Sequence, residues 1–233
     1  MRLSDFKGIF KTSKVEFISA VNIDEDYYVI SLKKPECLMW RPGEHAIFTL
    51  PGNKVAGKKY RAFSIASTPE EDVILLGTRT GKDVSSFKQN LINMKQGELV
   101  KLRGPFGWFT LQDSNSPVVF IGLGVGVTPF RALLKSFDQQ ENRNLEFIYS
   151  SSNVFLFKDE INKIVEQNDK FNMFYTRTIE ETNDAISESA RKYVNKAFYY
   201  IGGSQKAIKS ITKLLKMNGI KSKKIINDPF LGY

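Results

Sequence analysis

Residues 60–67, YRAFSIAS, place a cation, an aromatic ring and a hydroxyl within four positions. A guanidinium can bind a phosphate through two hydrogen bonds, an aromatic ring can stack on another flat ring, and a hydroxyl can donate to a ring nitrogen. Arg61, Phe63 and Ser64 therefore predict a site for a ligand that combines a diphosphate with a planar ring. Side chains alternate along a strand, so the strand must end or twist at Ser64 for all three to touch one ligand.

The stretch GKDVSSF at residues 81–87 can complete the diphosphate site. Gly81 and Ser85 lie at the start of a helical pattern that covers residues 85–94. Free N–H groups at the start of a helix attract anions. We therefore predict that a diphosphate lies between Arg61 and the turn at residues 81–86.

Two glycine-rich turns each follow an apolar run in the second half of the chain. Glycines allow close approach to the backbone, and a proline favours a first helical turn, where free N–H groups attract a phosphate. The second turn, Gly202-Gly203, leaves room for a flat group. The first turn alone is equally well explained as an ordinary strand–helix connection, and the second alone would usually be an ordinary loop, but two such turns at one edge of a sheet predict a shared ligand. The first turn, within IGLGVGVTPF (residues 121–130), contains Gly122, Gly124, Gly126, Thr128 and Pro129.

Short strand patterns separated by turn residues fill the first part of the chain. Turn signals such as Pro42-Gly43 and Thr80-Gly81 lie between these patterns. Many short strands with such turns predict a six-stranded antiparallel β-barrel, which we place at residues 1–112. The predicted strands are residues 15–21, 27–32, 45–50, 60–66, 72–78 and 98–103.

From residue 113 the pattern changes to strands that alternate with helices. The apolar residues Ile208, Ile211 and Leu215 form one stripe of a predicted helix, and lysines form its opposite face. This alternation predicts a five-stranded parallel, doubly wound α/β domain over residues 113–233, whose ligands bind beyond the carboxyl ends of the strands. The predicted strands are residues 118–122, 145–149, 171–175, 197–201 and 224–227.

Composition excludes several classes of site. The 233 residues include one cysteine, Cys37, and one histidine, His45. A single thiol cannot form an internal disulfide or hold an iron–sulfur cluster, and one histidine excludes His-rich metal sites, so we expect no metal. We expect Cys37 to be buried or half-buried, and His45 to pack against or cap a barrel strand. The chain has neither an apolar run of about 20 residues nor a signal-peptide pattern, which predicts a cytoplasmic protein without a membrane span.

The net charge of +9 favours acidic partners. On charge alone, a lysine-rich surface without any partner is the simpler explanation. Nucleic acid is not expected, because the lysine-rich helix lacks the interleaved aromatic residues that stack on bases.

Five motifs resemble those of the ferredoxin–NADP reductase superfamily of flavin-dependent oxidoreductases, over nearly the whole chain. RAFSIAS resembles its Arg-x-Tyr/Phe-Ser flavin motif, and GKDVSSF its Gly-x-x-Ser pyrophosphate motif. GPFGWF at residues 104–109 matches its Gly-Pro-x-Gly turn between domains. GLGVGVTPF resembles its Gly-Gly-x-Gly-x-Thr-Pro nicotinamide-nucleotide loop, and FLGY at residues 230–233 resembles the aromatic chain end of several members.

The resemblance implies FAD as the cofactor and NAD(P)H as the co-substrate. Arg61 would bind the FAD diphosphate, Phe63 would pack on the isoalloxazine ring, and Ser64 would act catalytically by hydrogen-bonding flavin N5. Tyr233, the second implied catalytic residue, would cover the flavin face where nicotinamide docks; the alternative is a frayed chain end. The other implied cofactor-binding residues are Ala62, Thr78, Gly81, Val84, Ser85, Gly124, Gly126, Thr128, Pro129, Ser151, Ser152, Gly203 and Ser204.

Several residues depart from the superfamily pattern. Phe63 lacks the hydroxyl of the common tyrosine, and Leu123 replaces the first glycine of the nucleotide loop. Gly202 replaces a cysteine near the reacting nicotinamide, and Ser204 replaces the following proline, which bears on hydride-transfer speed more than on binding. Residues 149–153 lack both the arginine of NADP-specific members and the acidic residue that binds an NAD ribose. The candidates for a 2′-phosphate are Ser151, Ser152, Lys158 and Arg177.

We therefore expect an NAD(P)H-dependent flavoprotein reductase. It would pass a hydride from NAD(P)H to flavin N5 and single electrons to a separate acceptor, because no iron–sulfur domain is present in the sequence. The predicted acceptor is an acidic carrier such as ferredoxin or flavodoxin, and an oxygenase component, free flavin and ferric iron are the alternatives. A second hypothesis is an electron-relay or non-catalytic flavoprotein subunit of a larger complex, motivated by Gly202 and Leu123. The sequence does not fix the preference between NADH and NADPH.

Overall fold

The structure, a computed structural model, describes residues 3–137 and 142–228. The chain forms two compact units, which we call the barrel unit, up to Thr110, and the parallel-sheet unit, from Leu111. Within the two described ranges, no helix is both long enough and apolar enough to cross a membrane.

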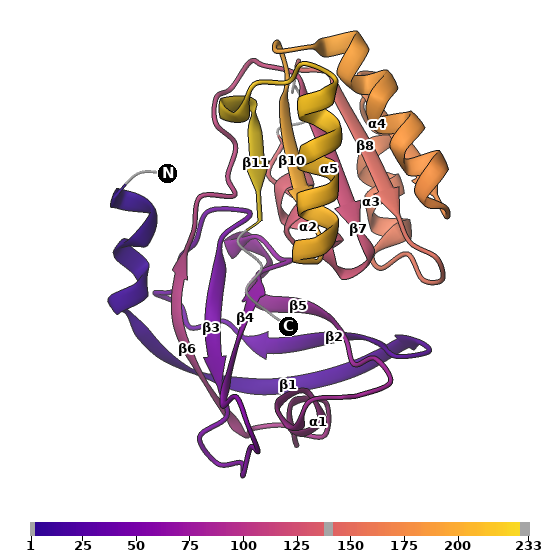
Figure 1. Ribbon diagram of the computed structural model, residues 1–233. Helices are drawn as coiled ribbons and strands as arrows, with labels where there is room; N and C mark the ends of the chain where they lie inside the picture. Colours follow the sequence, from indigo (N-terminus) through magenta and orange to yellow (C-terminus); the bar gives the residue numbers. More distant parts are fainter. Residues whose placement is uncertain (1–2, 138–141, 229–233) are drawn as a thin grey trace. The chain divides into compact units, whose positions relative to one another are not determined.

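The barrel unit is a six-stranded sheet in the order β4-β3-β6-β1-β2-β5, and every neighbouring pair is antiparallel (Figure 1). Just beyond β4, the N–H of Ala66 donates to the carbonyl of Leu75 on β5, so the two edge strands meet. The predicted six-stranded antiparallel barrel is confirmed. Its elements are a 3-10 segment (Leu3–Phe10), β1 (Thr12–Asp24), β2 (Tyr27–Lys33), β3 (His45–Thr49), β4 (Tyr60–Ser64), a 3-10 turn (Pro69–Glu71), β5 (Val73–Arg79), α1 (Ser86–Ile92) and β6 (Leu99–Phe106).

The barrel core follows from the alternation of apolar and polar residues along its strands. On β6, Val100 and Leu102 are buried, whereas Lys101 and Arg103 between and after them are exposed. Burying an aliphatic or aromatic side chain contributes about 1.5–3 kcal/mol each, so this alternation fixes which face turns inward. Helix α1 adds Phe87 and Leu91 to the same core, and so anchors its first turn against the barrel.

The parallel-sheet unit is a five-stranded sheet in the order β11-β10-β7-β8-β9, with every pair parallel. Helices connect the strands on both faces, which confirms the predicted doubly wound domain (Figure 1). Its elements are β7 (Val118–Leu123), a 3-10 turn (Gly124–Val127), α2 (Thr128–Lys135), β8 (Leu145–Ser150), α3 (Lys158–Val165), β9 (Phe171–Thr176), α4 (Ile179–Tyr193), β10 (Phe198–Gly202), α5 (Gln205–Met217), a 3-10 turn (Ser222–Lys224) and β11 (Ile225–Asn227).

Alternate residues of the central strand β7 serve the two helical layers. Ile121 belongs to the cluster that α4 and α5 complete with residues such as Leu215. Phe120 points to the other face, where its ring centroid lies 4.9 Å from that of Phe130 on α2 and 5.9 Å from that of Phe147. Both faces of the sheet are therefore apolar, which explains why its strands read as continuous hydrophobic runs.

The expectation for Cys37 was wrong, and that for His45 is confirmed. Cys37 is exposed, because it lies in the loop between β2 and β3, where Leu38 and Trp40 take the buried positions. His45 is buried, and its ring packs edge-on against Phe106 with centroids 4.4 Å apart.

Candidate cofactor and nucleotide site

Strand β4 ends at Ser64, as is needed if Arg61, Phe63 and Ser64 are to reach one ligand although side chains alternate along a strand. Ser64 is buried and pairs with His45 of β3, while Ala62 is half-buried and pairs with Ile47. Thr78 is buried on β5 and pairs with Tyr28. The strand therefore runs from a half-buried arginine to a buried serine within four residues.

Arg61 is held in place by its own loop and by α1. Its Nη1 donates to the carbonyls of Lys58 (3.0 Å) and Tyr60 (2.9 Å), and its guanidinium carbon lies 5.7 Å from the centroid of the Phe87 ring. No carboxylate of the described ranges forms an ion pair with it. A cation that is fixed and lacks a counter-charge is suited to bind an anion.

Phe63 contributes to the barrel core in this structure. Its side chain is 4% exposed, and its ring centroid lies 5.7 Å from that of Phe48 and 6.4 Å from that of Phe87. The expectation that this ring is free to stack on a ligand is therefore not met in the structure. The reason is that Phe63 shares its strand face with the inward-pointing side of β3, to which Phe48 belongs.

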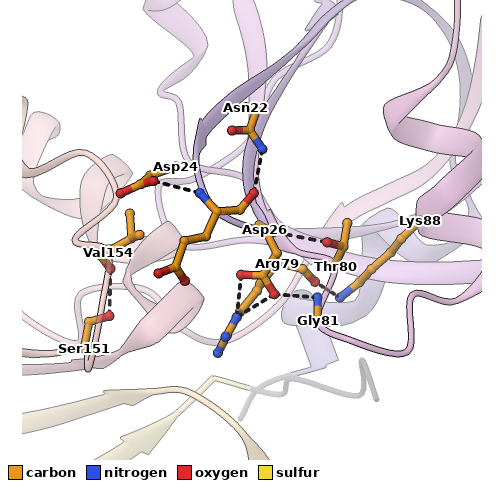
Figure 2. Close-up of polar contacts among 10 residues, drawn as sticks. Asn22, Asp24, Asp26, Arg79, Thr80, Gly81, Lys88, Ser151 and Val154 are labelled. Carbon is orange, nitrogen blue, oxygen red and sulfur yellow. Dashed lines mark hydrogen bonds and ion pairs between the residues drawn. The ribbon is translucent and has the colours of Figure 1, made fainter.

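The turn between β5 and α1 is tied to the hairpin between β1 and β2 (Figure 2). The Asp26 carboxylate accepts hydrogen bonds from Arg79 Nε at 2.9 and 3.0 Å and from the Gly81 N–H at 2.8 Å. The Thr80 N–H donates to the Asp26 carbonyl at 2.9 Å. Gly81 has a φ of +73°, a conformation that favours glycine. These contacts fix the path of the chain into α1.

Ser85 caps the start of α1. Its side chain accepts from the N–H of Lys88 at 3.4 Å, and Val84 before it is half-buried. The neighbouring Ser86 hydroxyl accepts from the N–H of Ala56 at 3.0 Å. The stretch from Gly81 to Ser85 therefore forms a fixed turn followed by an N-cap.

Lys88 is a residue of this site that sequence reasoning missed. It is 7% exposed, and its Nζ donates to the carbonyl of Arg79 at 2.6 Å (Figure 2). Burial, together with the nearby charge of Arg61, lowers the pKa of Lys88 to about 8, against an opposing effect of Asp26. Two neighbouring cations, one of them buried, make a bound anion favourable here. The sequence feature that could have indicated this residue is its position, three residues after the N-cap Ser85.

We predict that the ligand-free protein becomes more stable as the pH rises from about 8 towards 10.5, the ordinary pKa of a lysine. In this window the unfolded chain keeps the Lys88 proton and the folded chain loses it, so unfolding takes up a proton and stability increases with pH. The expected gain in the free energy of unfolding is about 3 kcal/mol over this window, measured by urea unfolding at several pH values. Lys88→Met isolates the effect from other titrating groups: an equal pH dependence in this variant would contradict the prediction.

In the parallel-sheet unit, the two glycine turns pack backbone against backbone. A Cβ added at Gly126 would lie 2.3 Å from the carbonyl carbon of Gly202, and a Cβ at Gly202 would lie 2.3 Å from the carbonyl oxygen of Gly126. A Cβ at Gly203 would meet the Leu123 side chain at 2.9 Å. The room that we expected at Gly202 and Gly203 is therefore filled by the first turn, and a cysteine at position 202 would not fit.

Gly124 is the glycine that stays open. It has a φ of +56°, and an added Cβ would meet nothing within 4 Å. Thr128 donates its hydroxyl to the carbonyl of Val125 at 2.6 Å, and Pro129 stands at the first turn of α2. Thr128 thus closes the turn, and Gly124 leaves its backbone accessible. Ser204 caps α5 by accepting from the N–H of Ala207 at 3.3 Å.

The loop after β8 brings two of the four phosphate candidates together. Arg177 Nη1 donates to the carbonyls of Ser152 (3.1 Å) and Asn153 (3.2 Å), and both Arg177 and Ser152 are exposed. Ser151 is buried, and its hydroxyl donates to the Val154 carbonyl at 2.7 Å (Figure 2), so it serves the loop itself. Lys158 Nζ lies 5.2 Å from the centroid of the Tyr175 ring. Tyr233 lies outside the described residues.

Comparison with known proteins gives matches to both parts of the chain. Residues 120–211 match the family model described as oxidoreductase NAD-binding domain. A subunit of the Na(+)-translocating NADH-quinone reductase of Colwellia psychrerythraea is 33% identical over 138 residues, which are 51% of this chain and 44% of that protein. The same subunit from a Marinomonas species is 25% identical over 210 residues, 77% of this chain and 51% of that protein. The reductase component of a Mycolicibacterium goodii propane 2-monooxygenase is 31% identical over 144 residues, 57% of this chain and 40% of that protein. The chain spans about half the length of these relatives or less.

Solved structures share the fold over nearly the whole chain. Ferredoxin-NADP+ reductase from Plasmodium falciparum has a TM-score of 0.74 at 17% identity, and the match covers 93% of this chain and 95% of that one. An Amycolatopsis cytochrome P450 reductase has a TM-score of 0.76 at 19% identity, and the match covers 94% of this chain and 70% of that one. The arrangement of a barrel followed by a parallel sheet is therefore a known one.

Proposed function

We propose that this chain is an NAD(P)H-dependent flavoprotein reductase of the ferredoxin–NADP reductase superfamily, supported by the match of residues 120–211 to the oxidoreductase NAD-binding domain and by the fold that it shares with ferredoxin-NADP+ reductase. The observation that carries the proposal is the cationic site of the barrel unit, where Arg61 and the buried Lys88 lie at the capped turn of residues 81–85. A diphosphate would add negative charge beside Arg61, which forms no ion pair within the described ranges.

The residues fit FAD. Arg61, Lys88 and the N–H groups around Ser85 would hold its diphosphate, and Ser64 would lie about 10 Å further along β4, a separation suited to the ribityl chain. When bound, FAD would accept a hydride from NAD(P)H and release single electrons. The hydroxyl of Ser64 would donate to flavin N5, and no side chain needs to act as a general base.

The dinucleotide would bind at the carboxyl ends of the parallel strands, where the open Gly124 allows a phosphate to approach the backbone. Ser152, beyond β8, and Arg177, beyond β9, form an exposed pair at a position suited to the adenosine ribose and any 2′-phosphate. Gly126 and Gly203 would act by holding the two turns together.

Purified protein tests the proposal directly. We expect a flavin absorbance spectrum, with or without added FAD, and anaerobic bleaching of that spectrum by NADH or NADPH. Running the two nucleotides separately also measures the preference between them. If the protein stays colourless after incubation with FAD, the proposal is contradicted.

The proposed electron acceptor is a small acidic carrier protein, supported by the net charge of +9. We predict that the rate of carrier reduction falls at least ~10-fold between low and high salt, because opposite charges steer the encounter. The measurement is NAD(P)H oxidation with a ferredoxin or a flavodoxin over a salt series. A neutral quinone is the control acceptor, whose reduction should change little; equal salt dependence with both acceptors would reject an electrostatically docked carrier.

A second candidate function is that of an electron-relay subunit in a larger complex. Its support is that several relatives are named as one subunit of an NADH-quinone reductase, and that the chain spans about half their length or less. A relay subunit would bind FAD but oxidise NAD(P)H negligibly until a partner protein is added. Rapid steady-state turnover by the isolated chain would exclude this candidate.

A further inference from the structure

We propose that a groove between α5 and β11 binds an acidic segment of a partner protein. The groove has a volume of about 560 Å³. It lies in the parallel-sheet unit, because its lining residues come from helix α5 and from Asn227 of the edge strand β11. The inference does not depend on the proposed reductase activity. The residues that line it are Ile208, Lys209, Thr212, Lys213, Lys216, Met217 and Asn227.

One flank of α5 forms the wall of the groove. The helical lining residues come in adjacent pairs that repeat every four positions, at 208–209, 212–213 and 216–217. This repeat is the spacing of one helix flank, beside the stripe that Ile211 and Leu215 bury in the core. From Ile208 to Met217 the groove therefore runs along about two and a half helical turns, about 14 Å in length, which suits an extended segment better than a single small anion.

Within the described part of the chain, two polar atoms of the groove are buried without a hydrogen-bond partner. They are the Thr212 hydroxyl oxygen and the Asn227 side-chain oxygen. Buried polar atoms are nearly always paired, because an unpaired one keeps the cost of losing its water. The Asn227 oxygen can accept from a backbone N–H, and the Thr212 hydroxyl can donate to a carbonyl or carboxylate. A peptide segment offers both kinds of group.

The charge around the groove sets the chemistry of the partner. Residues 205–227 contain seven lysines and no aspartate or glutamate. Lys209, Lys213 and Lys216 line the groove, and within the described ranges none of the three forms an ion pair. Carboxylates at several positions along a segment would neutralise them, while Ile208 and Met217, which is 75% exposed, would contact apolar side chains between those carboxylates.

A flat lipid surface or a nucleic acid fits these features less well. A membrane cannot enter a hollow to reach the buried oxygens, and the lining has no aromatic residue on which a base could stack. An acidic, partly apolar peptide is the occupant that matches shape, hydrogen bonding and charge together.

The test is binding of a fluorescein-labelled peptide rich in glutamate and leucine, followed by fluorescence anisotropy with the full chain. The groove variant Lys209→Gln/Lys213→Gln/Lys216→Gln should bind at least ~10-fold more weakly. The matched control, Lys206→Gln/Lys221→Gln/Lys223→Gln, removes the same charge from lysines of the same segment outside the groove and should bind like the wild type. Thermal melts check that both variants fold.

The variant Thr212→Val tests the hydrogen bond to the segment separately from the charge of the lysines. Valine has nearly the same shape but no hydroxyl, so the free protein should melt at the same or a higher temperature while peptide binding weakens ~3-fold or more. Three results would overturn the proposal: equal loss of binding in the two triple variants, equal binding of the peptide with glutamine in place of glutamate, or tighter binding to phosphatidylglycerol vesicles than to the peptide.

Discussion

Arg61→Gln is expected to weaken FAD binding by roughly 100-fold, as measured by fluorescence titration of the apoprotein with FAD. The guanidinium is already positioned by the carbonyls of Lys58 and Tyr60 and by the Phe87 ring, so little conformational entropy opposes its contact with a diphosphate. Glutamine keeps part of the side-chain volume and removes the charge. The nearby Lys88 would then hold the diphosphate alone.

The control for this variant is Arg103→Gln, which removes an exposed arginine of the same unit from the middle of β6. Its affinity for FAD should equal that of the wild type. Among the residues that the structure describes, Arg61 donates hydrogen bonds only to the carbonyls of Lys58 and Tyr60, so the melting temperature of Arg61→Gln protein without FAD should shift by only a few degrees. Unchanged FAD affinity in the Arg61 variant would mean that the diphosphate, if bound, lies elsewhere.

The strands could be predicted because the apolar or polar character of each residue indicates whether that position is buried or exposed. Alternation on β6 and the continuous apolar runs of β7 and β8 reflect burial on one face or on both, and this information is local in the sequence. The turn at Gly81 and the cap at Ser85 were predictable for the same reason, since a left-handed turn and an N-cap favour particular residue types at single positions.

The missed features depend on contacts between distant parts of the chain. Lys88 reads as a solvated helix residue, and it becomes a buried cation only because β5 places the Arg79 carbonyl beside it. Likewise, Phe63 reads as an exposed ring until Phe48 and Phe87 are packed around it. Burial of this kind depends on the tertiary fold, and the residues adjacent in sequence do not indicate it.

The glycine turns illustrate the same limit, because sequence alone suggested that all their glycines make room for a ligand. In the structure Gly126 and Gly202 make room for each other, and among the glycines of these two turns Gly124 alone has open space at its Cβ. The superfamily resemblance placed the two turns correctly at the ends of β7 and β10. Which glycines pack against backbone and which stays open depends on contacts between the two turns, and these contacts are not visible in the sequence.

Gly126→Ala is therefore expected to abolish reduction of the flavin by NAD(P)H while leaving FAD bound. The new methyl group would lie 2.3–2.4 Å from three backbone atoms of Gly202 and Gly203, and backbone cannot rotate away as a side chain can. The two turns must separate, which displaces the nucleotide site and costs about 3 kcal/mol of stability. The measurements are urea unfolding and anaerobic bleaching by NAD(P)H, with dithionite reduction to confirm that the flavin is present.

Gly124→Ala is the matched control for this prediction, because it adds the same methyl group to the same turn in open space. Its only destabilising effect should come from placing alanine at a φ of +56°, which lowers the free energy of unfolding by about 1 kcal/mol and leaves the two turns in contact. If Gly126→Ala protein were as stable as Gly124→Ala protein and still bleached with NAD(P)H, the close packing of the turns would not matter for dinucleotide binding. If both variants bound the dinucleotide poorly but only Gly126→Ala unfolded early, Gly124 would be the position where ligand meets backbone and Gly126 the one that holds the turns together.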